Sequence, residues 1–271
     1  MPRRFANAAD AYDQHVGRYG AQLAAGLIDV AEIRPGQRVL DVGCGPGPLT
    51  HALTDRAGPG NVAAIDPSPE FVEACRARVP DADVRVGVAE QLPFSSGTFD
   101  ATLAQLVVQL MDDRDAGVAE MTRVTRPGGV IAACVWDSMT MPALRAFWDA
   151  ALAIAPERAG AIGDGRRVGY DRPDELAGLW RNCGLVDVTT GELHVNARYE
   201  SFEHLFAPFT AGTGHSGACY AALDDARQEH VRDEAYRRLG KPEAAFMLTA
   251  RAWWARGSVP ASKSSGRRPL G

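Results

Sequence analysis

Three glycines and an acid share one short segment of the chain, "DVGCGPG" at residues 41–47. Glycine has no Cβ atom, so Gly43, Gly45 and Gly47 allow a sharp backbone turn and let a ligand lie against the loop. A dinucleotide site needs the wider spacing G-x-G-x-x-G, with the pyrophosphate at a helix N-terminus. Here the spacing is G-x-G-x-G, and the carboxylate of Asp41 would repel a pyrophosphate but suit a ligand with a cationic amine. The other interpretation of Asp41 is a cap for the turn that follows it.

A second acid, Asp66, ends the next apolar run, "NVAAID" at residues 61–66. A carboxylate at the end of such a strand can accept hydrogen bonds from two ribose hydroxyls, and NAD-dependent enzymes use an acid in this way. Asp66 alone therefore does not separate the ligand classes. The loop spacing and Asp41 favour S-adenosylmethionine, which carries an amino group and a sulfonium but no phosphate. Cys44 lies inside the loop, and we prefer a small loop residue to a thiol nucleophile as its interpretation.

Short apolar runs alternate with helical stretches through the first half of the chain. The predicted strands are residues 38–42, 61–66, 82–88, the start of 98–108, and 130–136. Such alternation predicts a parallel sheet with helices on both faces. In an open parallel sheet a ligand binds outside the carboxyl ends of the strands, which is where the glycine loop and Asp66 fall.

Four segments, in this order, resemble the class I S-adenosylmethionine-dependent methyltransferases of the UbiE-like branch. They are "VLDVGCGPG", "AAIDPS", "AEQLPFSSGTFDATLAQLVVQLMDD" and "EMTRVTRPGGVIAACVWD". The resemblance covers residues 36–137 and extends more weakly to "AYDQHVGRYG" and to the last strand. It implies an α/β, Rossmann-like fold with a seven-stranded, mostly parallel sheet, helices on both faces and an antiparallel last strand. It also implies S-adenosyl-L-methionine as cofactor and S-adenosyl-L-homocysteine as product.

The resemblance implies roles at the methionine and ribose ends of that cofactor. Asp41 and the backbone of the glycine loop hold the methionine end, and Gln105 contacts the same moiety. Asp66 binds the ribose. The segment "AYDQHVGRYG" resembles a lid helix, so Tyr12 and Tyr19 are expected to close over the cofactor.

At the adenine end this chain departs from the family. Pro67 is expected to lie against the adenine. Val88 stands where the family has an Asp that faces the adenine amino group, so the backbone N–H of Ala89, or Glu90 or Gln91, must cover the gap. The predicted cofactor-binding residues are Tyr19, Asp41, Gly43, Cys44, Gly45, Gly47, Asp66, Pro67, Ala89, Glu90 and Gln105.

Two connections are long for a compact domain, and we interpret them as a largely helical substrate cap. The predicted division is N-terminal lid helices at 1–35, a cofactor-binding core at 36–137, a cap insertion at 138–170, a core helix and sixth strand at 171–195, a second cap insertion at 196–243, the last strand at 244–256 and a flexible tail at 257–271. We expect acceptor specificity to lie in the two insertions.

Aromatic and polar side chains near the expected cap suit a small, partly apolar acceptor. The predicted substrate contacts are Tyr12, Gln109, Trp136, Phe206 and Phe209. The other interpretation is that the aromatic residues form the core of the cap and that Trp136 is buried. If the acceptor needs a base, His15 and His215 are the candidates, each with a purely structural role as its alternative.

Composition excludes several other classes. The chain has 271 residues, a net charge of −5 and no basic cluster of the kind that binds nucleic acid. We find no apolar run long enough for a membrane span, no secretory signal and no metal-ligand spacing. The five scattered cysteines fit reduced thiols in the cytoplasm.

The sequence therefore predicts a methyltransferase that moves the methyl group of S-adenosylmethionine to an O, N or C nucleophile of a small molecule by in-line displacement. The alternative is a protein that binds S-adenosylmethionine without methyl transfer, and an NAD-dependent oxidoreductase is a more distant third. The expected partner is the small-molecule acceptor, with no nucleic acid and no membrane, and the oligomeric state is not predicted.

Overall fold

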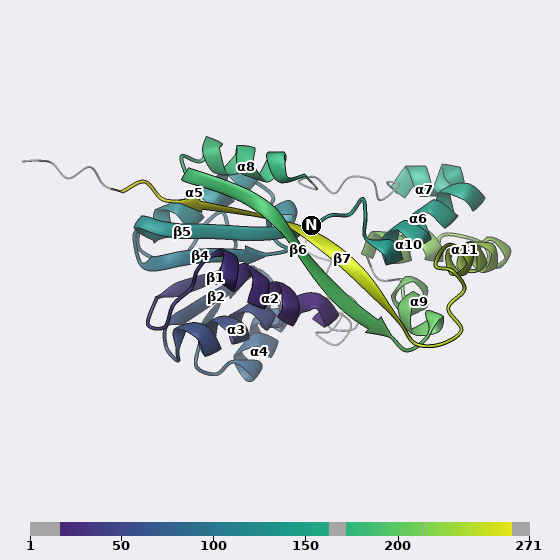
Figure 1. Cartoon of the computed structure of the whole chain (residues 1–271), viewed down its shortest axis with the longest axis horizontal. Helices are drawn as coiled ribbons and strands as arrows, with labels where there is room; N and C mark the ends of the chain where they lie inside the picture. Colours follow the sequence, from purple (N-terminus) through teal and green to yellow (C-terminus); the bar gives the residue numbers. More distant parts are fainter. Residues whose placement is uncertain (1–16, 163–171, 213, 262–271) are drawn as a thin grey trace, which may run out of the picture.

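A seven-stranded sheet with the order β3-β2-β1-β4-β5-β7-β6 organises the molecule (Figure 1). The structure is a computed structural model that describes residues 17–162, 172–212 and 214–261. The strands are β1 (Val39–Val42), β2 (Val62–Asp66), β3 (Asp83–Val86), β4 (Phe99–Gln105), β5 (Thr125–Trp136), β6 (Val186–Tyr199) and β7 (Phe246–Ser258). Neighbouring strands run parallel except at β7, which is antiparallel to both β5 and β6. The predicted Rossmann-like sheet with an antiparallel last strand is confirmed.

Helices cover both faces of this sheet because successive residues of the central strands point to opposite sides. Leu103 of β4 packs in one hydrophobic cluster and Ala104 in the other. The helices on the Leu103 face include α2 (Arg18–Val30) and α3 (Pro48–Ala57), followed by α4 (Pro69–Arg78) beside β2 and β3. Those on the Ala104 face are α5 (Arg114–Val124) and α8 (Pro173–Asn182).

The last two strands extend beyond the rest of the sheet as a two-stranded arm. The pairing of β5 with β7 ends at Trp136 and Ala252, whereas β6 and β7 stay paired as far as Tyr199 and Phe246. Helix α2 supports the arm through Gln22, whose amide exchanges two hydrogen bonds with the backbone of Asn196 (2.7 and 3.0 Å). The N-terminal helix therefore packs on the sheet and the arm.

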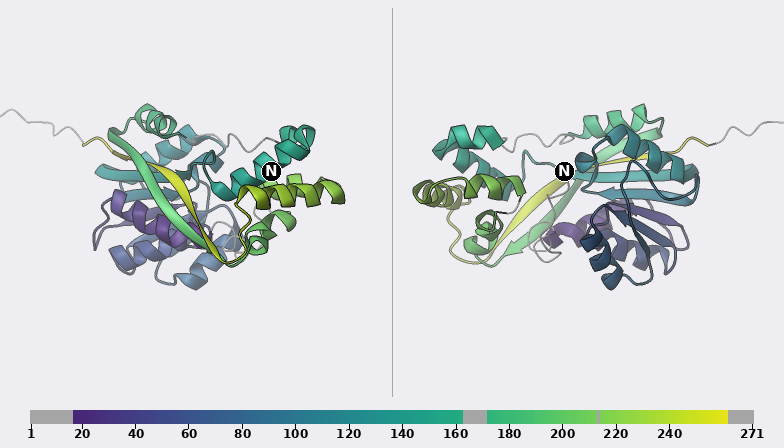
Figure 2. Two further views of the ribbon diagram at one scale, coloured as in Figure 1. Left: turned by 45° about the vertical axis from the view of Figure 1, so that its right-hand side comes forward. Right: turned by 180° about the vertical axis from the view of Figure 1, so that it is seen from behind.

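Five further helices gather at the end of the molecule that the arm reaches (Figures 1 and 2). They are α6 (Pro142–Ile154), α7 (Pro156–Ile162), α9 (Phe202–Thr210), α10 (Gly214–Ala221) and α11 (Asp225–Arg238). Helix α6 packs against α7, α10 and α11, and α9 packs against α10. The chain enters this group after the carboxyl end of β5 and again after the carboxyl end of β6. We call these five helices the helical cap.

Several boundaries differ from the predicted ones. Strand β5 begins at Thr125, because the "RPGG" segment joins the strand at an irregularity opposite Phe99 and Ala101. Strand β6 continues past residue 195 to Tyr199, and β7 continues to Ser258, into the segment predicted as tail. Each extension has a hydrogen-bonded partner strand far away in sequence, which local composition does not reveal.

Candidate cofactor site

The glycine loop joins the buried strand β1 to helix α3, which has Pro48 in its first turn. Its three glycines all have positive φ angles, +73° at Gly43, +52° at Gly45 and +100° at Gly47. That left-handed region is costly for residues with a Cβ atom. The backbone N–H groups of Gly43 and Cys44 both donate to the carbonyl of Ile65 (2.8 and 2.9 Å), so the loop is tied to the end of β2.

Protein neighbours also crowd two of these glycines. A Cβ atom on Gly43 would lie 2.4 Å from Cγ2 of Val107, and one on Gly47 would lie 2.8 Å from Sγ of Cys75. Both distances are far shorter than van der Waals contact. These two glycines are therefore required by the close approach of Val107 and Cys75 as well as by the turn.

Asp41, Asp66 and Gln105 lie on one face of three adjacent strands. Asp41 is in register with Ala64 of β2 and with Leu103 of β4, and Asp66 and Gln105 each follow two residues later on their strands. Because side chains alternate along a strand, all three project to the face covered by α2 and α3. Two acids and an amide thus meet at the carboxyl ends of β1, β2 and β4.

Asp41 is fully buried, and its two carboxylate oxygens differ in environment. Oδ2 accepts a 2.6 Å hydrogen bond from the hydroxyl of Thr50, whereas Oδ1 is buried with no donor among the described residues. Burial, together with the charge of Asp66, raises the pKa of Asp41 to about 7, although the Thr50 hydrogen bond opposes the shift. A buried carboxylate oxygen without a donor is costly, so Oδ1 is suited to a donor supplied by a ligand.

Asp66 is held in place by the glycine loop and by the start of α4. Oδ2 accepts from the N–H of Gly45 and Oδ1 from the N–H of Ser68, both at 2.9 Å. Burial raises the pKa of Asp66, and these two hydrogen bonds oppose the shift. Each carboxylate oxygen has a second lone pair that can accept from a further hydroxyl. Pro67 is exposed directly beside it, as a flat apolar surface.

Gln105 is oriented by the N-terminal helix. Its amide Nε2 donates to the carbonyl of Gly20 on α2 (3.2 Å), and its Oε1 is buried without a donor in the described part of the chain. The next residue, Leu106, has a φ of +62°, an uncommon conformation for a residue with a side chain. Backbone strain of this kind often occurs at functional sites. Gln109 follows in a 3-10 turn (Val108–Leu110), and its Oε1 is a third buried acceptor to which none of the described residues donates.

In the segment predicted to contact the adenine, the side chain of Glu90 is already hydrogen-bonded to another loop. Oε1 of Glu90 accepts from the backbone N–H groups of Asp112 and Asp113 (2.9 and 3.2 Å), which ties this loop to the start of α5. Ala89 is 8% exposed and Val88 is 45% exposed. Of the residues considered for the missing adenine contact, Glu90 is thus engaged by backbone donors, and Gln91 is exposed.

The remaining cofactor candidates, Cys44 and Tyr19, are buried. The hydrogen bond with Cys75 and burial hold the pKa of the Cys44 thiol above its ordinary value, which argues against a nucleophile. Tyr19 is 1% exposed, and its hydroxyl shares a 3.0 Å hydrogen bond with Tyr199 at the end of β6. Its ring meets that of Trp136 edge to face at 5.3 Å. Tyr19 therefore connects α2 with the ends of β5 and β6.

The structure places the two predicted cap phenylalanines inside the cap. Phe206 and Phe209 are 2% and 1% exposed, with ring centroids 5.1 Å apart. Phe209 stacks on Phe147 at 4.6 Å, and Phe206 meets Tyr220 at 5.3 Å. These contacts correspond to the alternative in which the aromatics form the core of the cap. Trp136 is partly exposed at the carboxyl end of β5.

The candidate bases cannot be placed against this site. Tyr12 and His15 lie outside the described residues, and His215 is on α10 with a side chain that is also outside them. No group of three or more metal-ligating side chains occurs in the part of the chain that the structure describes. None of the helices within residues 17–162, 172–212 and 214–261 has the length and apolarity needed to cross a membrane.

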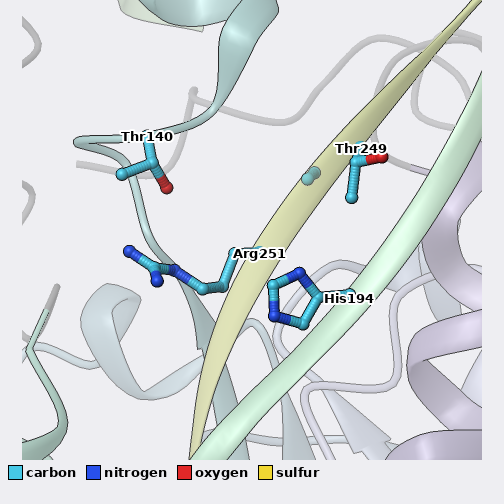
Figure 3. A pocket seen from close by; sticks show the side chains of 5 residues that line it. Thr140, His194, Thr249 and Arg251 are labelled. Atoms are coloured by element: carbon cyan, nitrogen blue, oxygen red, sulfur yellow. The ribbon is translucent and has the colours of Figure 1, made fainter.

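A separate cavity of about 250 Å³ lies where the β5–α6 connection meets the arm (Figure 3). Its lining residues are Thr140, His194, Thr249, Ala250 and Arg251. The guanidinium of Arg251 bonds Asp137 (2.5 and 2.9 Å) and Glu192 (3.2 Å), and His194 pairs with Glu192 (3.0 Å). Because the two basic side chains already have acidic partners, this cavity is a polar junction between the sheet and the cap.

The sequence analysis did not identify Thr50, Gly20 or Val107, although all three shape the site. Thr50 contacts Asp41, Gly20 contacts Gln105, and Val107 crowds Gly43. Each contact joins residues that local patterns treat separately. The only signal for Thr50 is a hydroxyl in the first turn of the helix that follows the loop.

Comparisons with known proteins agree with this geometry. A methyltransferase-domain family profile matches residues 40–133. The ubiquinone/menaquinone biosynthesis C-methyltransferase UbiE of Bordetella parapertussis is 32% identical over 178 residues, which are 58% of this chain and 67% of that protein. A malonyl-[acyl-carrier protein] O-methyltransferase of Erwinia billingiae is 35% identical over 151 residues, or 55% of this chain and 58% of that protein.

The chain spans between 29% and 59% of the length of four curated relatives, the Erwinia protein and three others. Among solved structures, the YcgJ protein of Bacillus subtilis has a TM-score of 0.57 at 17% identity, covering 89% of this chain and 99% of that one. At that identity the likeness concerns the fold.

Proposed function

Because this chain belongs to the class I S-adenosylmethionine-dependent methyltransferases, we propose that it transfers the methyl group of S-adenosylmethionine to a small-molecule acceptor. The observation that carries the proposal is a pair of buried acceptors on adjacent strands, Oδ1 of Asp41 and Oε1 of Gln105, that have no donor among the described residues. An ammonium group has three N–H donors and no acceptor, so it suits such a pair. The methionine end of S-adenosylmethionine carries such a group.

The rest of the site fits the same cofactor. Asp66 has spare acceptor capacity for ribose hydroxyls at the end of β2, and Pro67 offers an exposed apolar surface for a base. The buried carboxylate of Asp41, directly before the glycine loop, opposes the binding of a pyrophosphate, whose charge has the same sign. The site therefore favours S-adenosylmethionine over a dinucleotide.

When bound, S-adenosylmethionine supplies a methyl group on a sulfonium, which an O, N or C nucleophile takes by in-line displacement. In this mechanism the protein provides position and exclusion of water. Asp41 and Gln105 hold the amine, Asp66 holds the ribose, and the partly exposed Trp136 and Gln109 stand at the strand ends where an acceptor would approach.

We assign acceptor choice to the helical cap and its connections, because the residues of the glycine loop serve any acceptor. The name of the Bordetella relative, a ubiquinone/menaquinone biosynthesis C-methyltransferase, supports a small-molecule acceptor. Since the Erwinia relative is an O-methyltransferase, the names leave the nucleophilic atom open. We also place the protein in the cytoplasm, a proposal supported by its five free cysteines.

Isothermal titration calorimetry tests the proposal. We expect micromolar binding of S-adenosylmethionine and S-adenosylhomocysteine, weaker binding to an Asp41→Asn variant, and no binding of NAD. Binding of NAD without either sulfur compound would contradict the proposal. Methyl transfer itself is tested by mass spectrometry of a small-molecule fraction incubated with methyl-labelled S-adenosylmethionine. Cofactor binding without any labelled product across acceptor classes would favour a binding protein.

A further inference from the structure

Thr50 connects two helices to the buried acid of the site. It lies in the first turn of α3 and is fully buried. Its hydroxyl donates to Oδ2 of Asp41 at 2.6 Å and accepts from the thiol of Cys75 on α4 at 3.6 Å. A continuous hydrogen-bonded chain therefore runs from α4 through α3 to β1.

Helix α3 contains two threonines whose hydroxyls have different partners. Thr54, one turn later, donates its hydroxyl to the carbonyl of Thr50 (2.9 Å), which is the ordinary bond of a threonine to the preceding turn. Thr50 instead directs its only donor across the glycine loop. Its hydroxyl thus serves Asp41 and not the helix.

The hydrogen bond decides which oxygen of Asp41 is available. Oδ2 is taken by Thr50, and Oδ1 is the buried oxygen without a donor in the described part of the chain. Rotation of the carboxyl group would break a short bond from a hydroxyl to a carboxylate, which is stronger than a bond between neutral groups. The carboxylate is therefore held with one particular oxygen free.

The same bond opposes the effects that favour a neutral acid. Asp41 faces Asp66 on β2, Cys44 in the loop and Cys75 on α4, and none of these supplies a positive charge. The ionised form is stabilised by Thr50, mainly through its hydroxyl and to a smaller extent through its backbone N–H. A protonated Asp41 would bind an ammonium group poorly, because it has lost its charge.

We propose that Thr50 is a positioning residue for the cofactor: its hydroxyl orients Asp41 and favours the carboxylate form that would receive the ammonium group. The inference rests on the proposed function, since it assumes that S-adenosylmethionine binds at Asp41.

Calorimetry with S-adenosylhomocysteine between pH 6 and 9 tests this role in three variants. Thr50→Val keeps the shape of the side chain and removes the hydroxyl. We expect it to weaken binding by about ten- to hundredfold near pH 7, the effect of losing a hydrogen bond to a charged group. The loss should shrink as the pH rises and Asp41 ionises. Thr50→Ser should bind within about threefold of the unmodified protein, and Thr54→Val is the matched control with an unchanged dissociation constant.

A second measurement needs no cofactor. The pKa of Asp41 in the folded protein, about 7, exceeds its ordinary value, so the folded state holds an extra proton between the two values. Stability against unfolding therefore falls as pH rises through that interval. In Thr50→Val this decrease in the free energy of unfolding should continue to higher pH, because loss of the hydrogen bond raises the pKa of Asp41 further. In Asp41→Asn the decrease should disappear, because the titrating group is gone. Thr50→Ala serves the same two measurements if Thr50→Val folds poorly.

The outcomes are distinguishable. If the unmodified protein binds neither S-adenosylmethionine nor S-adenosylhomocysteine, the proposed function is wrong and the inference falls with it. If the unmodified protein binds, but the hydroxyl-free variants show its affinity and its pH profile, only the role of Thr50 is overturned. An equal loss in Thr50→Ser and Thr50→Val would likewise contradict it, because both would then reflect packing.

Discussion

Substituting Gly43 with alanine tests whether the fold itself requires a glycine at this position in the absence of any ligand. The residue has a φ of +73°, and a new Cβ atom would lie 2.4 and 2.6 Å from the two methyl carbons of Val107. The left-handed backbone costs a residue with a Cβ about 1–2 kcal/mol. Overpacking typically adds about 1–3 kcal/mol. We therefore expect Gly43→Ala to lower the free energy of unfolding by about 2–5 kcal/mol, in a protein that still folds.

Gly36 provides a matched control. It has a φ of +82°, and a Cβ atom there would meet nothing within 4 Å. Gly36→Ala should therefore lower the free energy of unfolding only by the cost of the left-handed backbone, about 1–2 kcal/mol. The difference between the two variants measures the contact with Val107.

Urea denaturation, with Val107→Ala alone and combined with Gly43→Ala, completes the test as a double-mutant cycle. In the Gly43→Ala background, we expect Val107→Ala to restore most of the free energy of unfolding lost to overpacking, about 1–3 kcal/mol. It should restore none of the free energy lost to the left-handed backbone. If Gly43→Ala is no more damaging than Gly36→Ala, or if shortening Val107 recovers nothing, the steric explanation of Gly43 is wrong.

Two further predictions concern Asp66 and the cap. Asp66→Ala should weaken S-adenosylhomocysteine binding by about ten- to hundredfold in calorimetry, and should also lower the melting temperature because the N–H groups of Gly45 and Ser68 lose their acceptor. Asp83→Ala, which removes an exposed partner of Arg85, is its control, and equal affinities in the two variants would refute the assignment. Phe206→Ala should destabilise the protein by about 3–5 kcal/mol, as for other buried aromatics, and leave affinity for S-adenosylhomocysteine within about threefold. Met247→Ala, at a side chain that is 56% exposed, should change neither, and a stable Phe206→Ala variant would remove Phe206 from the cap core.

The first five strands could be predicted within a few residues because their signals are local. All four residues of β1 are buried, as expected for a short apolar run that ends in a glycine turn. The antiparallel last strand came from the family resemblance and is confirmed by the pairing of β7 with β5 and β6. No local pattern specifies that direction.

The ends of the last two strands could not be predicted because they depend on distant partners. Gly257 and Ser258 look like the start of a polar tail, yet they pair with Ile131 and Val130 of β5. In the same way, the segment predicted as a lid contains Tyr19, which is buried against Trp136 and bonded to Tyr199. Contacts with residues more than a hundred positions away produce no periodic pattern in the local sequence.

The two acids of the candidate site could be predicted from the sequence, but the residues that hold them in position could not. Asp41 and Asp66 are evident because an acid after an apolar run marks the carboxyl end of a parallel strand, where ligands bind. Thr50 is nine positions beyond Asp41 and reaches it only once the loop has folded back. Val88, read as a lost contact, is 45% exposed. Glu90, one of the three residues expected to cover the gap beside Ala89 and Gln91, accepts from the backbone at the start of α5.

The glycines of the loop indicate a backbone conformation, whereas the buried acceptors of this site point to a ligand. Gly43 and Gly47 would be needed even without a ligand, because Val107 and Cys75 occupy the space of their missing side chains. A loop of this kind therefore identifies a backbone conformation first. Oδ1 of Asp41 and Oε1 of Gln105 are different, because burying an acceptor that receives no hydrogen bond from the described part of the chain is unfavourable. Such atoms reduce stability unless a ligand donates to them, so the cost they impose on the free protein is the physical observation that best supports the proposed ammonium site.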